Sequence, residues 1–125
     1  MHTTAGVVAV VEDDAAMRKS IERLLHANNF ETLAYASAEE FLYCPLAAGA
    51  GAGGLVLDIH LPGISGIDLR RRLLASGSKL PVIFITARDD NATRAEALAA
   101  GCVAFLQKPF DPYRLTEALQ RAMEQ

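Results

Sequence analysis

The chain has 125 residues, of which 51% are hydrophobic and 22% charged, and its formal net charge is −3. This length and composition fit one globular domain, residues 1–125, with a core large enough to fold without disulfide or metal staples. The weak negative charge gives no general attraction to nucleic acid or anionic lipid, and no apolar stretch approaches the roughly 20 residues that span a bilayer, so we expect a cytoplasmic protein.

Five apolar runs alternate with segments that carry helical signals. Short apolar runs bounded by turn residues predict strands, and capping residues mark the starts of the helices between them. The predicted strands lie near residues 7–11, 31–35, 55–58, 82–86 and 102–106. The expected helix signals are the cap Asp14, the capping box Ser37 with Glu40, Ser65 with Asp68, a fourth helix from about Ala92 to Ala100, and Asp111 followed by Pro112.

This alternation predicts an α/β fold of the (βα)5 type. Strands that are apolar throughout need cover on both faces, which a parallel sheet between two helical layers provides. We expect a doubly wound, five-stranded parallel sheet of flavodoxin-like order 2-1-3-4-5. In that order the first and third strands are neighbours, and ligands bind beyond their carboxyl ends.

Three acids follow those two neighbouring strands. Glu12 and Asp13 end the first strand and Asp58 ends the third, so their carboxylates are expected to converge. Such acids repel unless a cation lies among them. Oxygen-only ligation favours Mg2+, and the cysteines and histidines show no metal-ligand spacing. The alternative is two ordinary exposed acids at a loop and one unrelated aspartate.

Two further strand ends indicate phosphoryl transfer. Thr86 closes the fourth strand with a hydroxyl, and Lys108 follows the fifth with an ammonium group. Metal, hydroxyl and ammonium around one carboxylate suit a reaction in which the protein neutralises and aligns phosphoryl oxygens. Asp58 would then be the nucleophile that forms an acyl phosphate.

These residues resemble the receiver domains of two-component response regulators over essentially the whole chain, and they look most like the FixJ-type branch. Glu12 stands where aspartate is more common in the family. The matching segments are residues 11–20 with their acid pair, 37–42, the Leu57–Gly66 segment around Asp58, Ile85-Thr86-Ala87 and Lys108-Pro109-Phe110.

The resemblance implies a role for each acid. Asp58 would accept a phosphoryl group from the phosphohistidine of a histidine kinase. Asp13 would bind Mg2+ directly, Glu12 partly through water, and the backbone carbonyl of His60 would be a further ligand. Asp58 itself would complete the protein ligands.

The resemblance also implies how the phosphoryl group is held and sensed. Thr86, the backbone N–H of Ala87 and Lys108 would contact its oxygens, and the peptide bond before Pro109 would be cis. Thr86 would move toward the phosphoryl group and let Phe105 turn inward. A role of Phe105 in the core alone remains open.

The surface formed by the fourth helix, the fifth strand and the fifth helix would carry this change outward, to a homodimer or another partner. The FixJ-type resemblance favours a piece of a longer transcription regulator over a stand-alone receiver, with DNA bound only through an output domain if the full-length protein has one. We expect no enzyme activity beyond weak self-dephosphorylation.

Other functions fit these residues less well. Metal-dependent phosphohydrolases that use an aspartate nucleophile usually place a second aspartate two residues after it, where this chain has His60. A phosphorylation-independent pseudo-receiver, an interaction module, would be expected to lack an acid or the lysine. Residues 49–54 match the dinucleotide motif G-x-G-x-x-G, but they precede a strand rather than a helix, so a flexible connector is expected.

Overall fold

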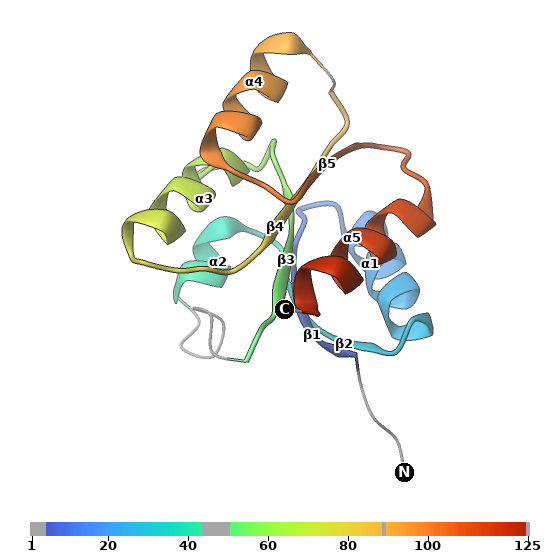
Figure 1. Ribbon diagram of the computed structural model, residues 1–125. Helices are drawn as coiled ribbons and strands as arrows, with labels where there is room; N and C mark the ends of the chain where they lie inside the picture. The colour runs from blue at the N-terminus through green and yellow to red at the C-terminus, as the bar shows by residue number, and fades with distance from the viewer. Residues whose placement is uncertain (1–4, 44–50, 89, 125) are drawn as a thin grey trace.

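The computed structural model describes residues 5–43, 51–88 and 90–124 (Figure 1). Five parallel strands form one sheet in the order β2-β1-β3-β4-β5, as predicted. The strands are β1 (Gly6–Val11), β2 (Phe30–Tyr35), β3 (Gly54–Asp58), β4 (Val82–Thr86) and β5 (Ala104–Gln107). The helices are α1 (Ala15–Ala27), α2 (Ala38–Tyr43), α3 (Gly66–Ala75), α4 (Asn91–Ala100) and α5 (Pro112–Met123).

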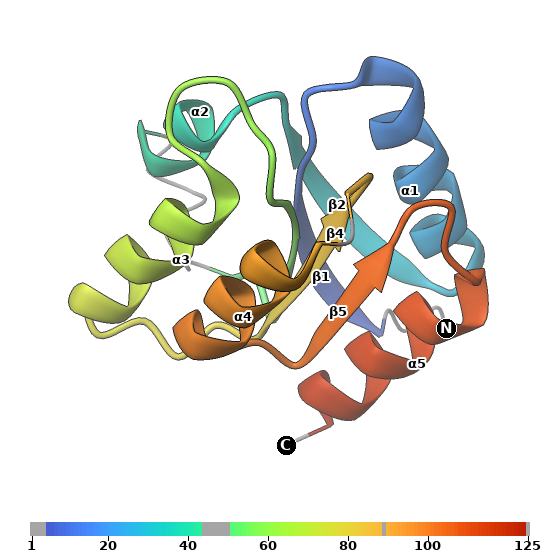
Figure 2. The same cartoon turned by 90° about the horizontal axis from the view of Figure 1, so that it is seen from above.

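Helices cover both faces of the sheet. Figure 2 shows α1 and α5 on one side and α2, α3 and α4 on the other. Alternate strand residues fill two apolar clusters, one on each side; β3, for example, directs Leu55 and Leu57 to one cluster and Val56 to the other. All five residues of β3 and of β4 are buried, which explains why these strands read as continuous apolar runs.

The expected caps are present. Asp14, Ser65 and Asp111 accept hydrogen bonds from the first backbone N–H groups of their helices, and Ser37 accepts one from Glu40 N. The fourth helix starts one residue earlier than expected, because Asp90 is its capping residue. These side chains satisfy N–H groups that have no partner within the helix.

The position of the fifth strand corrects the prediction of residues 102–106. The strand runs from Ala104 to Gln107, because Gly101 ends α4 with φ +89° and the chain turns through Cys102 before pairing begins. Val103 N already donates to Val82 O at 2.8 Å, but its side chain is 48% exposed. Apolar character therefore extended the predicted strand toward the turn.

Two other expectations concern the glycine-rich stretch and the membrane. Gly54 begins β3, whereas residues 44–50, which include Cys44 and the first two residues of the expected connector, lie outside the described residues. In the described part of the chain, every helix is too short or too polar to cross a lipid bilayer.

Candidate functional site

The three acids lie together at the carboxyl edge of the sheet. The side chains of Glu12 and Asp58 are buried, with residue exposures of 0% and 5%, while Asp13 is exposed. β1 and β3 are adjacent, with Val11 opposite Leu57, so each strand delivers its acid to the same place. One oxygen of each carboxylate lies within 4.8 Å of the others. The burial of Glu12 distinguishes this cluster from ordinary exposed loop acids.

Lys108 lies against two of the three carboxylates. Its Nζ donates to Glu12 Oε1 at 2.5 Å and to Asp58 Oδ2 at 3.2 Å. The strand register brings it there, since Lys108 N donates to Thr86 O at the end of β4. The Lys108–Pro109 peptide bond is cis, the isomer that the resemblance implied. A half-buried ammonium group therefore partly neutralises the acids.

For both Glu12 and Lys108, burial and hydrogen bonding between the two side chains shift the pKa in opposite directions. Burial raises the pKa of Glu12 to about 7, although the hydrogen bond from Lys108 lowers it. Burial opposes the charge of Lys108, but the hydrogen bond to Glu12 and the negative charge of Asp58 outweigh it, so the pKa of Lys108 is raised. The lysine therefore stays protonated beside the two buried acids.

Backbone groups fix the two buried carboxylates. Asp58 Oδ1 accepts from His60 N at 3.0 Å, and Glu12 Oε2 accepts from Asp14 N at 3.1 Å. Asp58 Oδ1 is thereby held by the chain that follows β3, while Oδ2 faces Lys108. His60 itself is exposed directly after the strand, at the rim of the cluster.

Arg18 is a contributor that the sequence analysis missed. It lies on the first turns of α1, and its guanidinium donates to the backbone carbonyl of Glu12 at 2.9 Å. A basic residue one turn after the cap Asp14 was the available signal, but its target depends on how α1 folds back toward the end of β1. The bond ties α1 to the acid-bearing turn.

The predicted phosphoryl contacts at the end of β4 are close by, but the Thr86 hydroxyl is turned elsewhere. Thr86 is fully buried, and its Oγ1 donates to Arg88 O at 2.9 Å and accepts from Arg88 N at 3.0 Å. The hydroxyl is therefore engaged with the β4–α4 connection. Ala87, the residue between them, is exposed.

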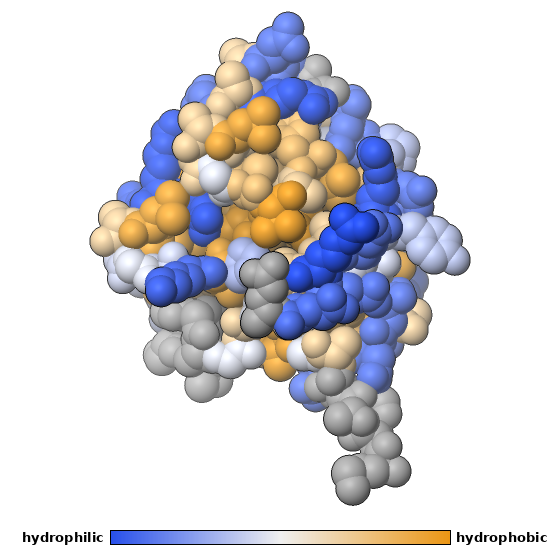
Figure 3. All heavy atoms as spheres, in the orientation of Figure 1, coloured by the Kyte–Doolittle hydropathy of each residue, from blue (hydrophilic) through white to orange (hydrophobic). Residues whose placement is uncertain are grey.

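Phe105 is half-buried on the same side of the sheet as α4. It packs against the apolar cluster of that side, and the Arg94 guanidinium lies 4.8 Å from the centre of its ring, a distance typical of a cation–π contact. Figure 3 shows apolar side chains gathered over α4 and β5, beside hydrophilic ones. Leu98 and Val103, at 60% and 48% exposure, are the large exposed side chains there.

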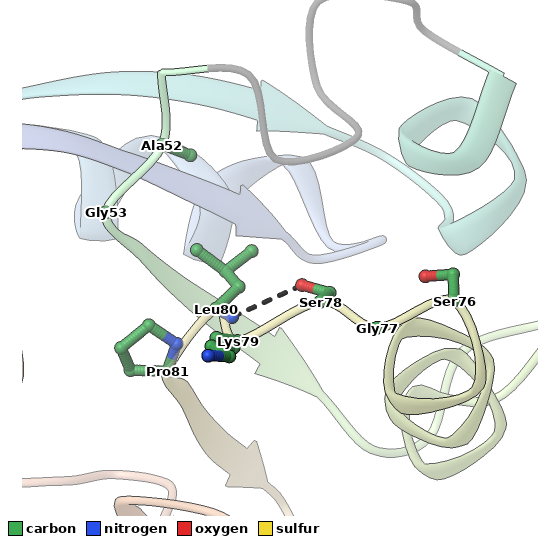
Figure 4. Close-up of a pocket in the computed structure, with 8 residues that line it drawn as sticks. All are labelled: Ala52, Gly53, Ser76, Gly77, Ser78, Lys79, Leu80 and Pro81. Carbon is green, nitrogen blue, oxygen red and sulfur yellow. Dashed lines mark hydrogen bonds between the residues drawn. The ribbon is translucent and has the colours of Figure 1, made fainter.

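A hollow of about 430 Å³ at the opposite edge of the sheet has different chemistry. It is lined by the residues before β3 and β4 and the end of α3, and Figure 4 shows mostly small residues there, together with Lys79, Leu80 and Pro81. Lys79 is the charged residue among them, and Ser78 Oγ accepts a hydrogen bond from Leu80 N at 3.2 Å. The lining offers no group of acids or nucleophiles, so the carboxyl edge is the candidate site.

Comparisons with known proteins agree with this geometry. The family model described as "Response regulator receiver domain" matches residues 8–120. The chain is 37% identical to the transcriptional regulatory protein FixJ of Bradyrhizobium diazoefficiens, over 98% of this chain and 59% of that protein. It is 38% identical to nodulation protein W of the same organism, over 98% of this chain and 53% of that protein.

The solved structures agree as well. A crystal structure of full-length FixJ from B. japonicum superposes with a TM-score of 0.88 and 37% identity, covering 98% of this chain and 60% of that one. The chain therefore spans little more than half the length of these relatives.

Proposed function

Because the chain belongs to the family of response regulator receiver domains of two-component systems, we propose that Asp58 accepts a phosphoryl group from a histidine kinase in an Mg2+-dependent reaction. The observation that carries the proposal is the convergence of three carboxylates within 4.8 Å, with Lys108 3.2 Å from Asp58. A pseudo-receiver would have no need to keep this costly cluster of buried charge.

The donor set suits Mg2+. It consists of carboxylate oxygens from Glu12, Asp13 and Asp58, to which the His60 carbonyl would add a neutral oxygen. When bound, Mg2+ neutralises charge on the phosphoryl oxygens and on the acids. Asp13, the exposed acid, is the side chain that solvent and metal reach first.

Asp58 supplies the nucleophile. One of its carboxylate oxygens forms a bond to phosphorus as the bond from phosphorus to the kinase imidazole nitrogen breaks, and the electron pair of that bond returns to the imidazole. Lys108 moves from its bond with Asp58 Oδ2 to a phosphoryl oxygen, which spreads negative charge away from the reacting atoms. The backbone N–H of Ala87 supplies another donor. No further chemistry beyond slow hydrolysis of the acyl phosphate is proposed.

Thr86 and Phe105 form the switch. For the Thr86 hydroxyl to reach the phosphoryl group it must leave Arg88, whose N–H and carbonyl it now bonds. Its departure frees space beside β5, into which Phe105 turns, and that movement changes the face with exposed Leu98 and Val103. This α4-β5-α5 face then binds a second copy or an output domain. Because FixJ is named a transcriptional regulatory protein, control of transcription is the output we propose.

The test is phosphorylation with a small acyl phosphate donor, acetyl phosphate, with and without Mg2+, followed by intact-mass spectrometry. We expect one added phosphoryl group with Mg2+ and none with Asp58→Asn. Asp68→Asn, which changes an exposed acid on α3, is the matched control and keeps the adduct. Absence of an adduct in folded wild-type protein would favour the pseudo-receiver instead.

A further inference from the structure

We propose that Glu39, on α2, is a positioning residue for the metal site: it holds the β3–α3 loop, residues 59–65, whose His60 carbonyl binds Mg2+. The inference rests on the proposed function, which makes His60 a ligand. Glu39 is 25 residues before Ile64, yet its Oε2 accepts a hydrogen bond from Ile64 N at 3.1 Å. The bond therefore joins the loop to a different element of the fold.

Gly63 shows how closely the carboxylate lies against the loop. A Cβ added at Gly63 would lie 2.2 Å from Glu39 Oε2, and Gly63 has φ +75°, a conformation that favours glycine. Glu39 thus contacts two consecutive loop residues, one through space that only glycine leaves open and one through a hydrogen bond. The loop and the side chain fit each other.

Each end of the loop is held by a hydrogen bond from a backbone N–H group. Gly66 N donates to Ile59 O at 3.0 Å, and His60 N donates to Asp58 Oδ1 at 3.0 Å. A Cβ at Gly66 would lie 2.2 Å from Asp58 O, so α3 starts directly against β3. Between these anchors, the bond from Glu39 to Ile64 is the cross-link that sets the path of the loop toward α2. A shift in that path moves the His60 carbonyl.

The second carboxylate oxygen of Glu39 indicates that filling apolar space is not the role of this side chain. Glu39 Oε1 is buried and has no hydrogen-bond partner among the described residues. A buried polar atom left unpaired costs roughly 1–3 kcal/mol, a cost that an apolar side chain at this position would avoid. The bond to the loop backbone is what a carboxylate adds here.

Three variants separate positioning from folding. Glu39→Met keeps the side-chain size but removes the acceptor, and Glu39→Gln keeps an acceptor oxygen for Ile64 N. Glu40→Met makes the same change at the next residue, which is exposed and bonded to Ser37. The readouts are hydrogen exchange of the Ile64 amide in metal-free protein, the Mg2+ dissociation constant by calorimetry, and the Mg2+ dependence of phosphorylation by acetyl phosphate.

We expect Glu39→Met to speed exchange at Ile64 and to weaken Mg2+ binding about tenfold, as loss of a group that orients a metal ligand does. Its phosphorylation rate should return to the wild-type value at saturating Mg2+. Glu39→Gln and Glu40→Met should stay within about twofold of wild type in Mg2+ affinity, and thermal unfolding checks that all three are folded.

The outcomes distinguish this inference from the proposed function. A folded Glu39→Met that binds Mg2+ as tightly as wild type overturns the role of Glu39, even if Asp58 is phosphorylated. If Glu39→Met does not fold, a Glu39→Gln variant with fast Ile64 exchange and unchanged Mg2+ affinity overturns it equally. Wild-type protein that binds Mg2+ but takes no phosphoryl group defeats the phosphoacceptor proposal, while the Mg2+ affinities still support or overturn the role of Glu39. A wild-type chain that binds no Mg2+ overturns both.

Discussion

The two edges of the sheet differ in chemistry: one buries charged side chains and the other small and apolar residues. At the carboxyl edge, Glu12 and Asp58 are buried carboxylates that meet one half-buried ammonium group, that of Lys108. At the amino edge, small residues meet the end of α5, and a Cβ at Gly6 or Gly53 would lie 2.6 or 2.8 Å from Met123 Cε. One edge buries charge, whereas the other combines apolar contact with a hollow lined mostly by small residues.

The difference shows where the fold gives up stability. Burying a charge costs free energy that pairing only partly returns, while apolar contact is favourable in itself. Both edges are ends of the same five strands. The amino edge and the two apolar clusters must therefore offset the free energy that the buried charges at the carboxyl edge cost. The stability of variants at the carboxyl edge should therefore depend on Mg2+ and pH, whereas that of variants at the amino edge should not.

Removing the ammonium group should have the largest effect. Lys108→Met leaves Glu12 and Asp58 buried without their cation, and we expect a loss of about 3 kcal/mol in the free energy of unfolding without Mg2+. Mg2+ should restore part of this loss, because it supplies positive charge at the same acids. Urea unfolding with and without Mg2+ measures both effects.

The matched control for Lys108 lies at the other edge. Lys79→Met removes an exposed lysine beside the hollow before β4, and its effect should stay within about 0.5 kcal/mol. Equal losses in the two variants would contradict the contrast between the edges.

A smaller effect is expected from pH. The pKa of Glu12 is about 7 in the folded protein against 4.5 as its ordinary value, so between these values the folded state holds a proton that the unfolded state has released. Stability therefore falls as pH rises through 7, by about 1 kcal/mol between pH 6 and pH 8 in metal-free protein. Lys108 stays charged over this range because its pKa is raised.

Glu12→Gln removes this titration and should flatten the pH dependence of the unfolding free energy. Comparing wild type with the variant cancels groups elsewhere in the chain that titrate in the same range. A wild-type protein that gained stability relative to Glu12→Gln on going from pH 6 to pH 8 would show that burial does not dominate at Glu12.

The smallest effect is expected at the amino edge. Gly53→Ala places a Cβ against the flexible end of Met123 and should cost between about 0.5 and 1 kcal/mol, since that side chain can move. Mg2+ affinity should not change. In a Met123→Ala background, the same substitution should cost less, and a double-mutant cycle by thermal unfolding measures the difference.

Much of this fold could be predicted from the sequence because caps and apolar runs involve only neighbouring residues. The caps Asp14, Ser65 and Asp111 bond to N–H groups two or three residues away, and the apolar runs that flank the turns mark the strands. The end of β5 nearest α4 was misjudged, since Val103 is apolar but lies in the turn after Gly101. Local apolar character alone does not show where hydrogen-bonded pairing begins.

The sequence by itself determined the five βα units, their parallel order, and the identity of the acids, hydroxyl and lysine at the strand ends. It did so because strand ends, caps and residue types are written within a few neighbouring positions. Only the tertiary structure decided that Glu12 is buried, that Lys108 bonds to Glu12, and that Glu39 reaches the loop at Ile64. These facts depend on how separate elements pack, and contacts between residues far apart in the chain leave no periodic signal.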